Sequence, residues 1–426
     1  MMDKKDFKIL FLSNAVFAPS GYGTQSNGML YPWLKAGYNV RQLAHYGLQG
    51  RQVGMNGLLL YPAIDGDPHG DRTARLIFQN WKPNVFFTLY DIWMGAYNEG
   101  DVNNPASLRA IHPYWIPIIM VDHSPIPEAT AVCASTAYKV ITPTKYGVEQ
   151  LKSKGIASEF IPFGIDTKIW KPQNEEEKRE SKKWLNERSV PISMEKRAVI
   201  DEDSFLVSIN GANKDPYRKA FMRSFIGLQL FLQDNPDAEK DTRVYIHSWM
   251  RLARDIPHGA KTLQVEWACK ASTDYQMLCG VPEDAMARIA GAADVFLHPT
   301  QGGGFEIPIM EHLSCGVPAI SSNFLGIPEL VKDCGWLIDP ITNEKGAKSL
   351  YFSPLDATQI ICDEYMIAEA LEDAYNNPKK AQAFGKKGRK RTVEENDWKH
   401  IHPKYYEILE EAREEQSYKP LKERKV

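Results

Sequence analysis

The sequence lacks any apolar run long enough to cross a membrane. Its longest apolar stretches, such as "VFFTLY" at 85–90 and "WIPIIMV" at 115–121, are far shorter than the ~18 residues that a membrane helix needs. The start, "MMDKKDFKILFLSN", also lacks the long apolar core of a secretion signal. We therefore expect no transmembrane segment and a cytoplasmic location.

The sequence also lacks clustered cysteines and a large net charge. Its six cysteines are scattered, with no CxxC pair and no His or Cys cluster of zinc spacing: 133, 269, 279, 315, 334 and 362. This pattern argues against a disulfide framework and a structural metal, so we expect the cysteines to be packing residues. The net charge of −3 argues against a nucleic acid or an anionic membrane as the partner of the whole molecule, although a local basic face stays open.

What the sequence does contain is an alternation of strand-like and helix-like segments. The first half carries "FKILFLSN", "NVRQLAHYG", "NVFFTLYD" and "WIPIIMVD", and the second half carries "SFLVSIN", "TRVYIHSWM", "DVFLHP", "VPAISS" and "GWLID". Strands that alternate with helices indicate a parallel sheet with helices on both faces. At 426 residues, two such α/β units are expected rather than one.

A charged stretch interrupts this alternation at 171–190, "KPQNEEEKRESKKWLNERSV". It is either a helix or a solvated linker, and we place the domain boundary there. The expected domains are 1–190, 191–395 and a tail, 396–426, whose apolar residues at helical spacing predict a final amphipathic helix.

Two glycine-rich loops lie between a strand and a helix. "GGGFEIPIMEHLSCG" at 302–316 places Pro308 where a helix opens and Gly316 just past its end. Such a loop directs backbone N–H groups and the positive end of a helix dipole at one point, which favours an anion such as phosphate. The alternative is that the glycines only permit a tight turn.

The other loop, "SNAVFAPSGYGTQSNG", contains Gly21 and Gly23 where a dinucleotide-binding fold carries its phosphate loop. Its spacing departs from GxGxxG, and the next strand ends without the acidic residue that would hold an adenosine ribose. A nicotinamide or flavin enzyme is therefore disfavoured.

The second half opens with "SINGANKDPYRKAF", in which a strand runs into a polar loop at 211–220. This loop offers Asn213, Lys214, Arg218 and Lys219 as candidates for binding a diphosphate, since cations after one strand can meet the glycine loop after another strand of the same sheet. Gly211 is a further candidate for donor binding. A solvated surface loop is the alternative.

Taken together and in order, these segments resemble the retaining GT-B glycosyltransferases that include sucrose synthase and bacterial mannosyltransferases. The resemblance rests on "LSNAVFAPSGYGTQ", "DHSPIP", "VITPTKYGVEQL", "IPFGIDTKIWKP", "SINGANKDPYRKAF", "GVPEDAMARIAGAADVFLHP", "PTQGGGFEIPIMEHLSCGVPAISSNFLGIPEL" and "CGWLID". It implies a GT-B fold, in which two Rossmann-like domains face each other across a cleft. The second domain then holds a nucleotide-sugar donor, the first holds the acceptor, and the tail helix returns to the first domain.

The resemblance also implies roles for individual residues. Glu311 matches the glutamate that binds the donor ribose, and Gly304 and Phe305 match the loop that meets the sugar and the diphosphate. Lys219, with Arg218 beside it, matches the lysine that neutralises the diphosphate. The family's upstream arginine has no clear counterpart in this sequence.

His123, in "DHSPIP", resembles the histidine that reaches the donor sugar, with a backbone-bonded structural histidine as the alternative. The family's first glutamate should stand at 303, where this sequence has Gly303, and a glutamate stands at 306 instead. Either Glu306 replaces it in the reaction, or the donor sugar is held differently.

The sequence thus predicts a metal-independent, retaining glycosyltransferase of the hexosyltransferase class, with the nucleotide-diphosphate sugar as co-substrate and no other cofactor. A glycan or another hydroxyl compound is the expected acceptor. A glycosyltransferase acting on modified bases of DNA and a catalytically silent sugar-nucleotide-binding relative are the alternatives.

Overall fold

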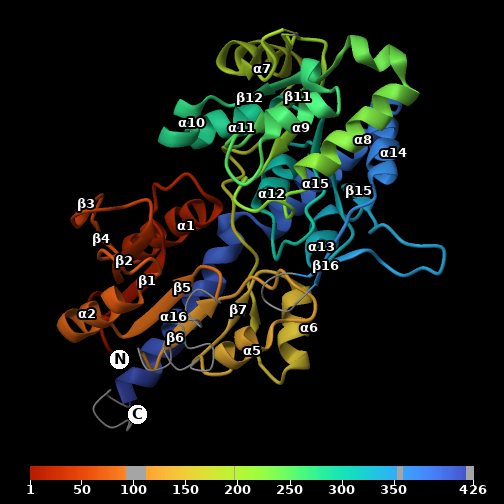
Figure 1. The fold of residues 1–426 in the computed structure, drawn as a ribbon. Coiled ribbons are helices and arrows are strands. Elements are labelled where there is room, and N and C mark those ends of the chain that lie inside the picture. Colours follow the sequence, from red (N-terminus) through yellow and green to blue (C-terminus); the bar gives the residue numbers. More distant parts are fainter. Residues whose placement is uncertain (93–111, 196, 353–357, 419–426) are drawn as a thin grey trace. The chain divides into compact units, whose positions relative to one another are not determined.

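The computed structural model describes residues 1–92, 112–195, 197–352 and 358–418 of the 426-residue chain. It forms two compact units, each built on one mainly parallel sheet (Figure 1). The first unit comprises Met1–Val121, Pro125–Gly164 and the chain from Trp398 onward, and the second comprises Asp122–Ser124 and Ile165–Asp397. The α/β fold class predicted from the sequence is confirmed.

The sheet of the first unit has the strand order β3-β4-β2-β1-β5-β6-β7-β8, and only β3 pairs in antiparallel orientation. Its strands are β1 (Lys8–Asn14), β2 (Asn39–Tyr46), β3 (Val53–Met55), β4 (Leu58–Pro62), β5 (Val85–Leu89), β6 (Trp115–Ile118), β7 (Ile141–Thr142) and β8 (Glu159–Phe160). Its helices are the short η1 (Lys4–Asp6), α1 (Gly21–Lys35), α2 (Asp71–Trp81), α5 (Glu128–Ala134), α6 (Lys145–Ser153) and α16 (Trp398–Tyr418).

The central strands of this sheet are buried on both faces. Every residue of β5 is buried, as is every residue of β1 after its first. This explains why both strands are almost continuously apolar in sequence, since helices cover a parallel sheet on both sides.

The tail helix α16 packs within the first unit. The rings of Tyr405 and Trp33 lie 5.7 Å apart, and Gln416 accepts a hydrogen bond of 3.0 Å from the side chain of Asn84. A helix of this length gains most of its stability from such packing rather than from its own propensity.

The main sheet of the second unit has the order β15-β14-β13-β10-β11-β12-β9, with only β9 antiparallel. Its strands are β9 (Val190–Pro191), β10 (Phe205–Asn210), β11 (Thr242–His247), β12 (Cys269–Ala271), β13 (Val295–His298), β14 (Ala319–Ser322) and β15 (Gly335–Ile338). A separate two-stranded sheet is formed by β16 (Leu350–Phe352) and β17 (Thr358–Ile360).

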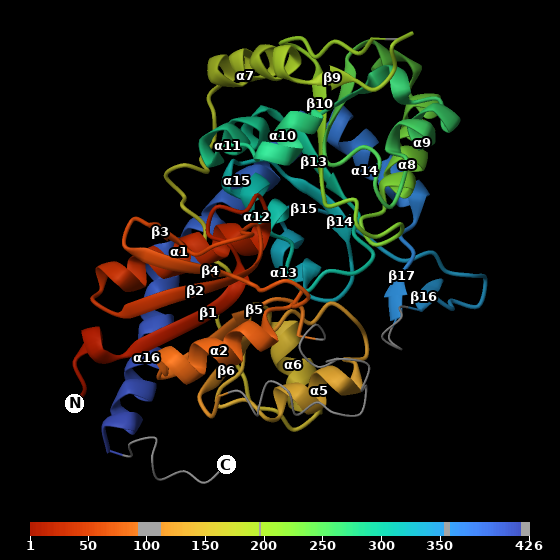
Figure 2. The ribbon, with the colours of Figure 1, turned by 60° about the vertical axis from the view of Figure 1, so that its left-hand side comes forward.

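The helices of the second unit surround this sheet, as Figure 2 shows from another side. They are α7 (Glu175–Arg188), α8 (Phe221–Asp234), η2 (Pro236–Lys240), α9 (Ile256–Thr262), η3 (Glu266–Ala268), α10 (Asp274–Cys279), α11 (Glu283–Ala292), α12 (Ile307–Ser314), α13 (Ile327–Val331), α14 (Glu364–Asn376) and α15 (Pro378–Glu395). The core lies between β10, β11 and β13 and helices α8 and α14. Helix α8 reaches it through Phe221, Phe225, Leu228 and Phe231, which share one helical face.

The boundary between the units lies earlier than the expected position at 190. Residues 165–190 belong to the second unit, because the charged stretch forms helix α7 and packs there. Leu185 is buried in a cluster with Ile289, and Lys182 makes an ion pair of 3.0 Å with Asp294. The stretch was hard to place from sequence because its few buried positions lie among many charges.

Five of the six cysteines are buried, as expected of packing residues, and Cys279 is exposed. No helix within the described ranges is both long enough and apolar enough to span a membrane.

Candidate functional site

The candidate site of the second unit forms where two neighbouring parallel strands end. The loop at 211–220 follows β10, the glycine loop at 299–306 follows β13, and β10 pairs directly with β13. The carbonyl of Arg218 accepts the backbone N–H of Gln301 at 2.8 Å, and the carbonyl of Tyr217 accepts the Gln301 side-chain amide at 2.6 Å. The carboxyl edge of a parallel sheet is where open α/β folds bind their ligands.

At the centre of this site lies a buried ion pair between Lys219 and Glu306. The Lys219 Nζ and the Glu306 Oε2 are 2.5 Å apart, and the two residues are only 8% and 5% exposed. The same carboxylate lies 3.1 Å from His298 Nε2 and 3.8 Å from the Arg218 guanidinium. Arg218 also donates to the carbonyl of Gly302 at 3.4 Å.

Burial and pairing set the ionisation of this cluster. Burial lowers the pKa of Lys219 from 10.5 to about 8, although Glu306 acts in the opposite direction. Burial alone would raise the pKa of Glu306, but Lys219 and His298 outweigh it and hold that pKa well below 4.5. Burial, followed by the nearby Lys219, lowers the pKa of His298. Near neutral pH the cluster therefore contains a carboxylate, an ammonium group, the Arg218 guanidinium and a neutral imidazole.

The glycine loop is shaped by close approach rather than by turn geometry. Gly302, Gly303 and Gly304 are not among the described glycines with positive φ. A Cβ on Gly303 would lie well under 3.0 Å from the Glu306 carboxylate, and one on Gly302 would meet the Gln359 amide as closely. Both glycines thus leave room for side chains of the protein itself. Phe305 follows them and is half-buried.

Glu311 lies in helix α12, one turn beyond its start. Its side chain is half-buried, and within the described part of the chain its carboxylate has no hydrogen bond or ion pair. Burial, together with the neighbouring Glu283, raises the pKa of Glu311 from 4.5 to about 8. A ligand that donates hydrogen bonds to this carboxyl group would stabilise its charged form. Gly316 follows the helix with φ +76, which fits the predicted helix end.

His123 belongs to the second unit, as part of the segment Asp122–Ser124. Its Nδ1 lies 2.6 Å from the Asp122 carboxylate. A carboxylate only accepts, so Nδ1 carries the proton and donates it. Asp122 also raises the pKa of Lys219, so these residues lie close enough to the ion pair to affect it.

Asn213 has a different environment from the one expected of a donor-binding residue. It is fully buried, its side-chain amide donates to the carbonyls of Trp249 and Arg254 at 2.9 and 2.8 Å, and its Oδ1 accepts from the Arg254 N–H at 3.0 Å. The side chain therefore holds the loop at 249–254. The carbonyl of Gly211 accepts a hydrogen bond of 2.7 Å from Ser248.

Gly21 and Gly23 lie in the first unit, at the start of helix α1. Ser20 caps this helix and accepts a hydrogen bond of 3.1 Å from the Gly23 N–H. A Cβ on Gly23 would collide with the carbonyl oxygen of Ala18, so this glycine allows the helix to pack on its own preceding loop. Lys219 and Glu306 belong to the other unit.

The structure adds residues to the site that sequence reasoning missed. His298 contacts Glu306, and Gln359 lies against Gly302. His298 stands at the end of a buried strand, eight residues before Glu306, and this position was the only signal in the sequence. No signal in the sequence pointed to Gln359, because it comes from a strand that is far from the glycine loop in the sequence.

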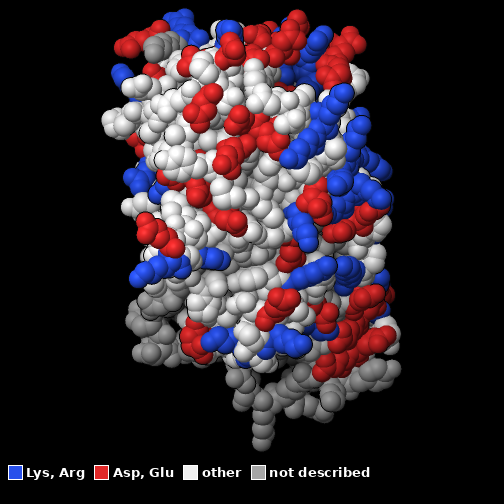
Figure 3. Space-filling model, turned by 90° about the vertical axis from the view of Figure 1, so that its right-hand side faces the viewer, with Lys and Arg blue, Asp and Glu red and all other residues white. Residues whose placement is uncertain are grey.

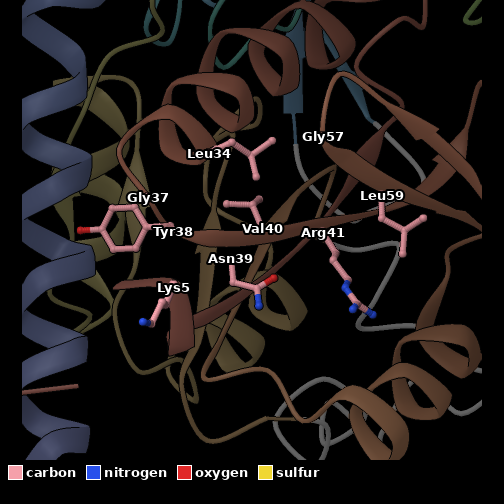
Figure 4. A pocket seen from close by; sticks show the side chains of 9 residues that line it. All are labelled: Lys5, Leu34, Gly37, Tyr38, Asn39, Val40, Arg41, Gly57 and Leu59. Atoms are coloured by element: carbon pink, nitrogen blue, oxygen red, sulfur yellow. The ribbon is translucent and has the colours of Figure 1, made fainter. Parts of the chain in front are cut away.

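A cavity of about 390 Å³ lies in the first unit, among Lys5, Tyr38, Arg41 and Leu59 (Figure 4). It sits where β2 and β4 begin, whereas ligands of open parallel sheets bind where strands end. We therefore do not assign the function to it. Within the described residues, no group of three His, Cys, Asp or Glu side chains is placed to hold a metal.

Residues 226–351 match the family model "Glycosyl transferases group 1". The chain is 42% identical over 60 residues to O-antigen chain mannosyltransferase B of Escherichia coli. It is 30% identical over 128 residues to alpha-maltose-1-phosphate synthase of Mycolicibacterium smegmatis. These segments cover 14% and 30% of this chain and 16% and 30% of the two relatives.

Solved structures resemble the chain over nearly its whole length. Sucrose-phosphate synthase from Thermosynechococcus elongatus has a TM-score of 0.71 and 14% identity, covering 95% of this chain and 98% of that one. Anabaena HepE, solved in complex with UDP and glucose, has a TM-score of 0.65 and 12% identity, covering 95% and 100%. Residues 226–351 are thus similar to group 1 glycosyl transferases, and the chain has the α/β fold of the GT-B glycosyltransferases.

Proposed function

We propose that this protein is a retaining glycosyltransferase of the hexosyltransferase class. It moves a sugar from a nucleotide-diphosphate sugar to an acceptor hydroxyl. The nucleotide sugar is a co-substrate, and the proposal includes no metal ion or other cofactor.

The observation that carries this proposal is the cation cluster beside the glycine loop. Lys219 and Arg218 meet that loop where β10 and β13 end. The glycine loop lies inside the matched residues 226–351, and the two cations lie shortly before them. The likeness to HepE, which was solved with UDP and glucose, supports a nucleotide sugar as the ligand.

In the proposed reaction, the bond between the anomeric carbon and the diphosphate oxygen breaks, and the acceptor oxygen bonds to the same carbon. Negative charge grows on the leaving diphosphate, and the Lys219 ammonium and Arg218 guanidinium stabilise it. The acceptor hydroxyl loses its proton to an oxygen of the leaving phosphate. Attack on the face that the diphosphate leaves retains the configuration.

Other residues bind and orient the donor in this proposal. The Glu311 carboxylate accepts hydrogen bonds from the two ribose hydroxyls, and these bonds offset the cost of burying its charge. His123 donates its Nδ1 proton to Asp122 and so presents Nε2 to the donor sugar. Gly304 and Phe305 provide backbone N–H groups for the sugar and the diphosphate.

Glu306 has a supporting role in this proposal, rather than that of a direct substitute for a glutamate at 303. Its carboxylate is 5% exposed and bonded to Lys219 and His298. It holds the lysine in place and favours its charged form.

A second candidate is a silent relative that binds a sugar nucleotide without turnover. It is favoured by the absence of a side chain at Gly303 and by the pairing of Lys219 with a protein carboxylate. A DNA acceptor is less favoured, since the chain has a net charge of −3 and the face shown in Figure 3 carries acidic as well as basic side chains. A phosphate backbone calls for a basic surface.

The test is a screen of uridine, guanosine and adenosine diphosphate sugars by thermal shift, because a ligand that binds only the folded state raises the melting temperature. Donors that stabilise the protein are then assayed for hydrolysis and for transfer to glycan acceptors. Product NMR gives the anomeric configuration, and inversion would refute the retaining mechanism. Stabilisation without turnover would favour the silent relative.

A further inference from the structure

Strands β16 and β17, which lie between β15 and α14 in the chain, pair with each other in a two-stranded sheet separate from the main sheet, and we call this pair the β16–β17 hairpin. Figure 2 shows this hairpin set apart from β14 and β15. Its inner strand, β17 (Thr358–Ile360), is more buried than β16, in which Phe352 is 72% exposed. The burial of β17 indicates that it packs on something other than its hairpin partner.

One partner of β17 is Ser124. The Thr358 N–H donates to the Ser124 carbonyl at 3.1 Å, and the Ser124 N–H donates to the Thr358 carbonyl at 3.3 Å. The Thr358 hydroxyl donates to the same carbonyl. Both backbone groups of Thr358 are therefore used on Ser124, which is next to His123.

The other partner of β17 is the glycine loop. The Ile360 N–H donates to the Gln301 carbonyl at 3.2 Å, and Gln359, which is 3% exposed, places its amide against Gly302. Gln301 is the residue that also bonds the carbonyls of Tyr217 and Arg218. Strand β17 thus runs from the His123 segment to the loop that lies beside Lys219.

The segment at 122–124 carries His123 and pairs with β17 through Ser124. It is three residues long in the second unit, and its neighbours in sequence, Val121 and Pro125, belong to the first unit. A pair of backbone hydrogen bonds to a strand is directional, so it fixes the orientation of the segment as well as its position.

We propose that the β16–β17 hairpin is a positioning device that orients His123 toward the donor sugar, with Thr358 as its key residue. This inference rests on the proposed function. Contact between His123 and the sugar needs the imidazole within hydrogen-bond reach, and a displacement of about 1 Å can reduce a rate by up to about a hundredfold.

The test variant is Thr358→Pro, which removes the N–H that bonds the Ser124 carbonyl. The matched control is Phe352→Pro, at the position that pairs with Thr358 on the exposed outer strand. Because Thr358 uses its backbone groups on Ser124, the N–H of Phe352 faces away from β17. We expect Thr358→Pro to lower kcat at least tenfold with nucleoside diphosphate affinity unchanged, and Phe352→Pro to retain both.

A double-mutant cycle with His123→Ala separates positioning from general damage to the fold. If the hairpin acts through His123, Thr358→Pro has little further effect once His123 is removed. Independent losses from the two changes, or a normal kcat for Thr358→Pro, would overturn the proposal. Thr358→Val, which keeps the backbone N–H, should retain most of the activity.

Hydrogen exchange tests the clamp, by which we mean the backbone hydrogen bonds between Thr358 and Ser124, without an activity assay. The Ser124 amide should be protected in the parent chain and in Phe352→Pro, and should exchange faster in Thr358→Pro. An unprotected Ser124 amide in the parent refutes the clamp whatever the protein does. A protected amide in a protein that turns over no donor would refute the proposed function and, with it, the role of the clamp in transfer.

Discussion

The two glycine loops of this chain look alike in sequence but serve different purposes. Gly21 and Gly23 open helix α1, where Ser20 caps the helix and Gly23 makes room for the Ala18 carbonyl. Gly302 and Gly303 instead make room for the side chains of Gln359 and Glu306, which carry the loop's contacts to the rest of the site. The difference shows that glycine content predicts close approach, while the charges nearby indicate what the loop is for.

The largest expected effect comes from removing the charge beside the second loop. Lys219→Ala should reduce transfer about a hundredfold, since it removes the ammonium group that stabilises the leaving diphosphate in the proposed reaction. Initial rates at saturating donor measure this. The matched control is Lys182→Ala, which also removes a buried ion pair, with Asp294, away from the site. Equal losses in both variants would mean that Lys219 is only structural.

Adding one methyl group to each loop compares the two directly. Gly303→Ala should displace the Glu306 carboxylate and lower turnover about tenfold with a small loss of stability. Gly23→Ala should instead lower the free energy of unfolding by about 1–3 kcal/mol, because its neighbour is a backbone oxygen. Urea unfolding and rates on both variants decide this. A stable, fully active Gly303→Ala variant would show that the two loops do not differ in this way.

The pH dependence of transfer tests the charge of Lys219 beside the second loop. With a Lys219 pKa of about 8, kcat/KM should fall as the pH rises through 8, because the free enzyme loses the ammonium charge. Glu306→Gln removes the group that raises this pKa, so the fall should begin at a lower pH. The profile of the parent serves as the reference. If the fall of kcat/KM at high pH begins at the same pH in the parent and in Glu306→Gln, another group titrates there.

A smaller effect is expected at Glu311. Above about pH 8, where the Glu311 side chain is a carboxylate, Glu311→Gln should weaken nucleoside diphosphate binding several-fold, as it removes a charge-assisted acceptor. The raised pKa of Glu311 contributes stability that is present below pH 4.5 and is lost as the pH rises through about 8. The variant should therefore show a flatter stability profile over that range. Unfolding curves at several pH values measure this, and an identical slope in parent and variant would contradict it.

Much of the fold could be predicted because its signals are local. The apolar strands β1, β5, β10 and β13 and the helix between Pro308 and Gly316 stand where the sequence indicated, since periodicity, proline and glycine act within a few residues. The short strands β3, β12, β16 and β17 were missed, because segments of three residues carry too little pattern.

The candidate site could be predicted only in part. Sequence pointed to Lys219, Arg218, Glu306 and Glu311 through their place after strands and through the resemblance to a family. It assigned Asn213 to the donor, whereas its amide is used by the backbone of 249–254. It could not assign Gln359, which reaches Gly302 from a separate hairpin.

By itself, the sequence determined an alternating α/β chain with two glycine loops and a cationic loop at strand ends, because these features depend on neighbouring residues. Only the tertiary structure decided that Lys219 pairs with Glu306, 87 residues away, and that Thr358 holds Ser124, 234 residues away. Such pairs depend on which strands become neighbours in a sheet. That choice is made by the burial of whole elements, and no local pattern records it.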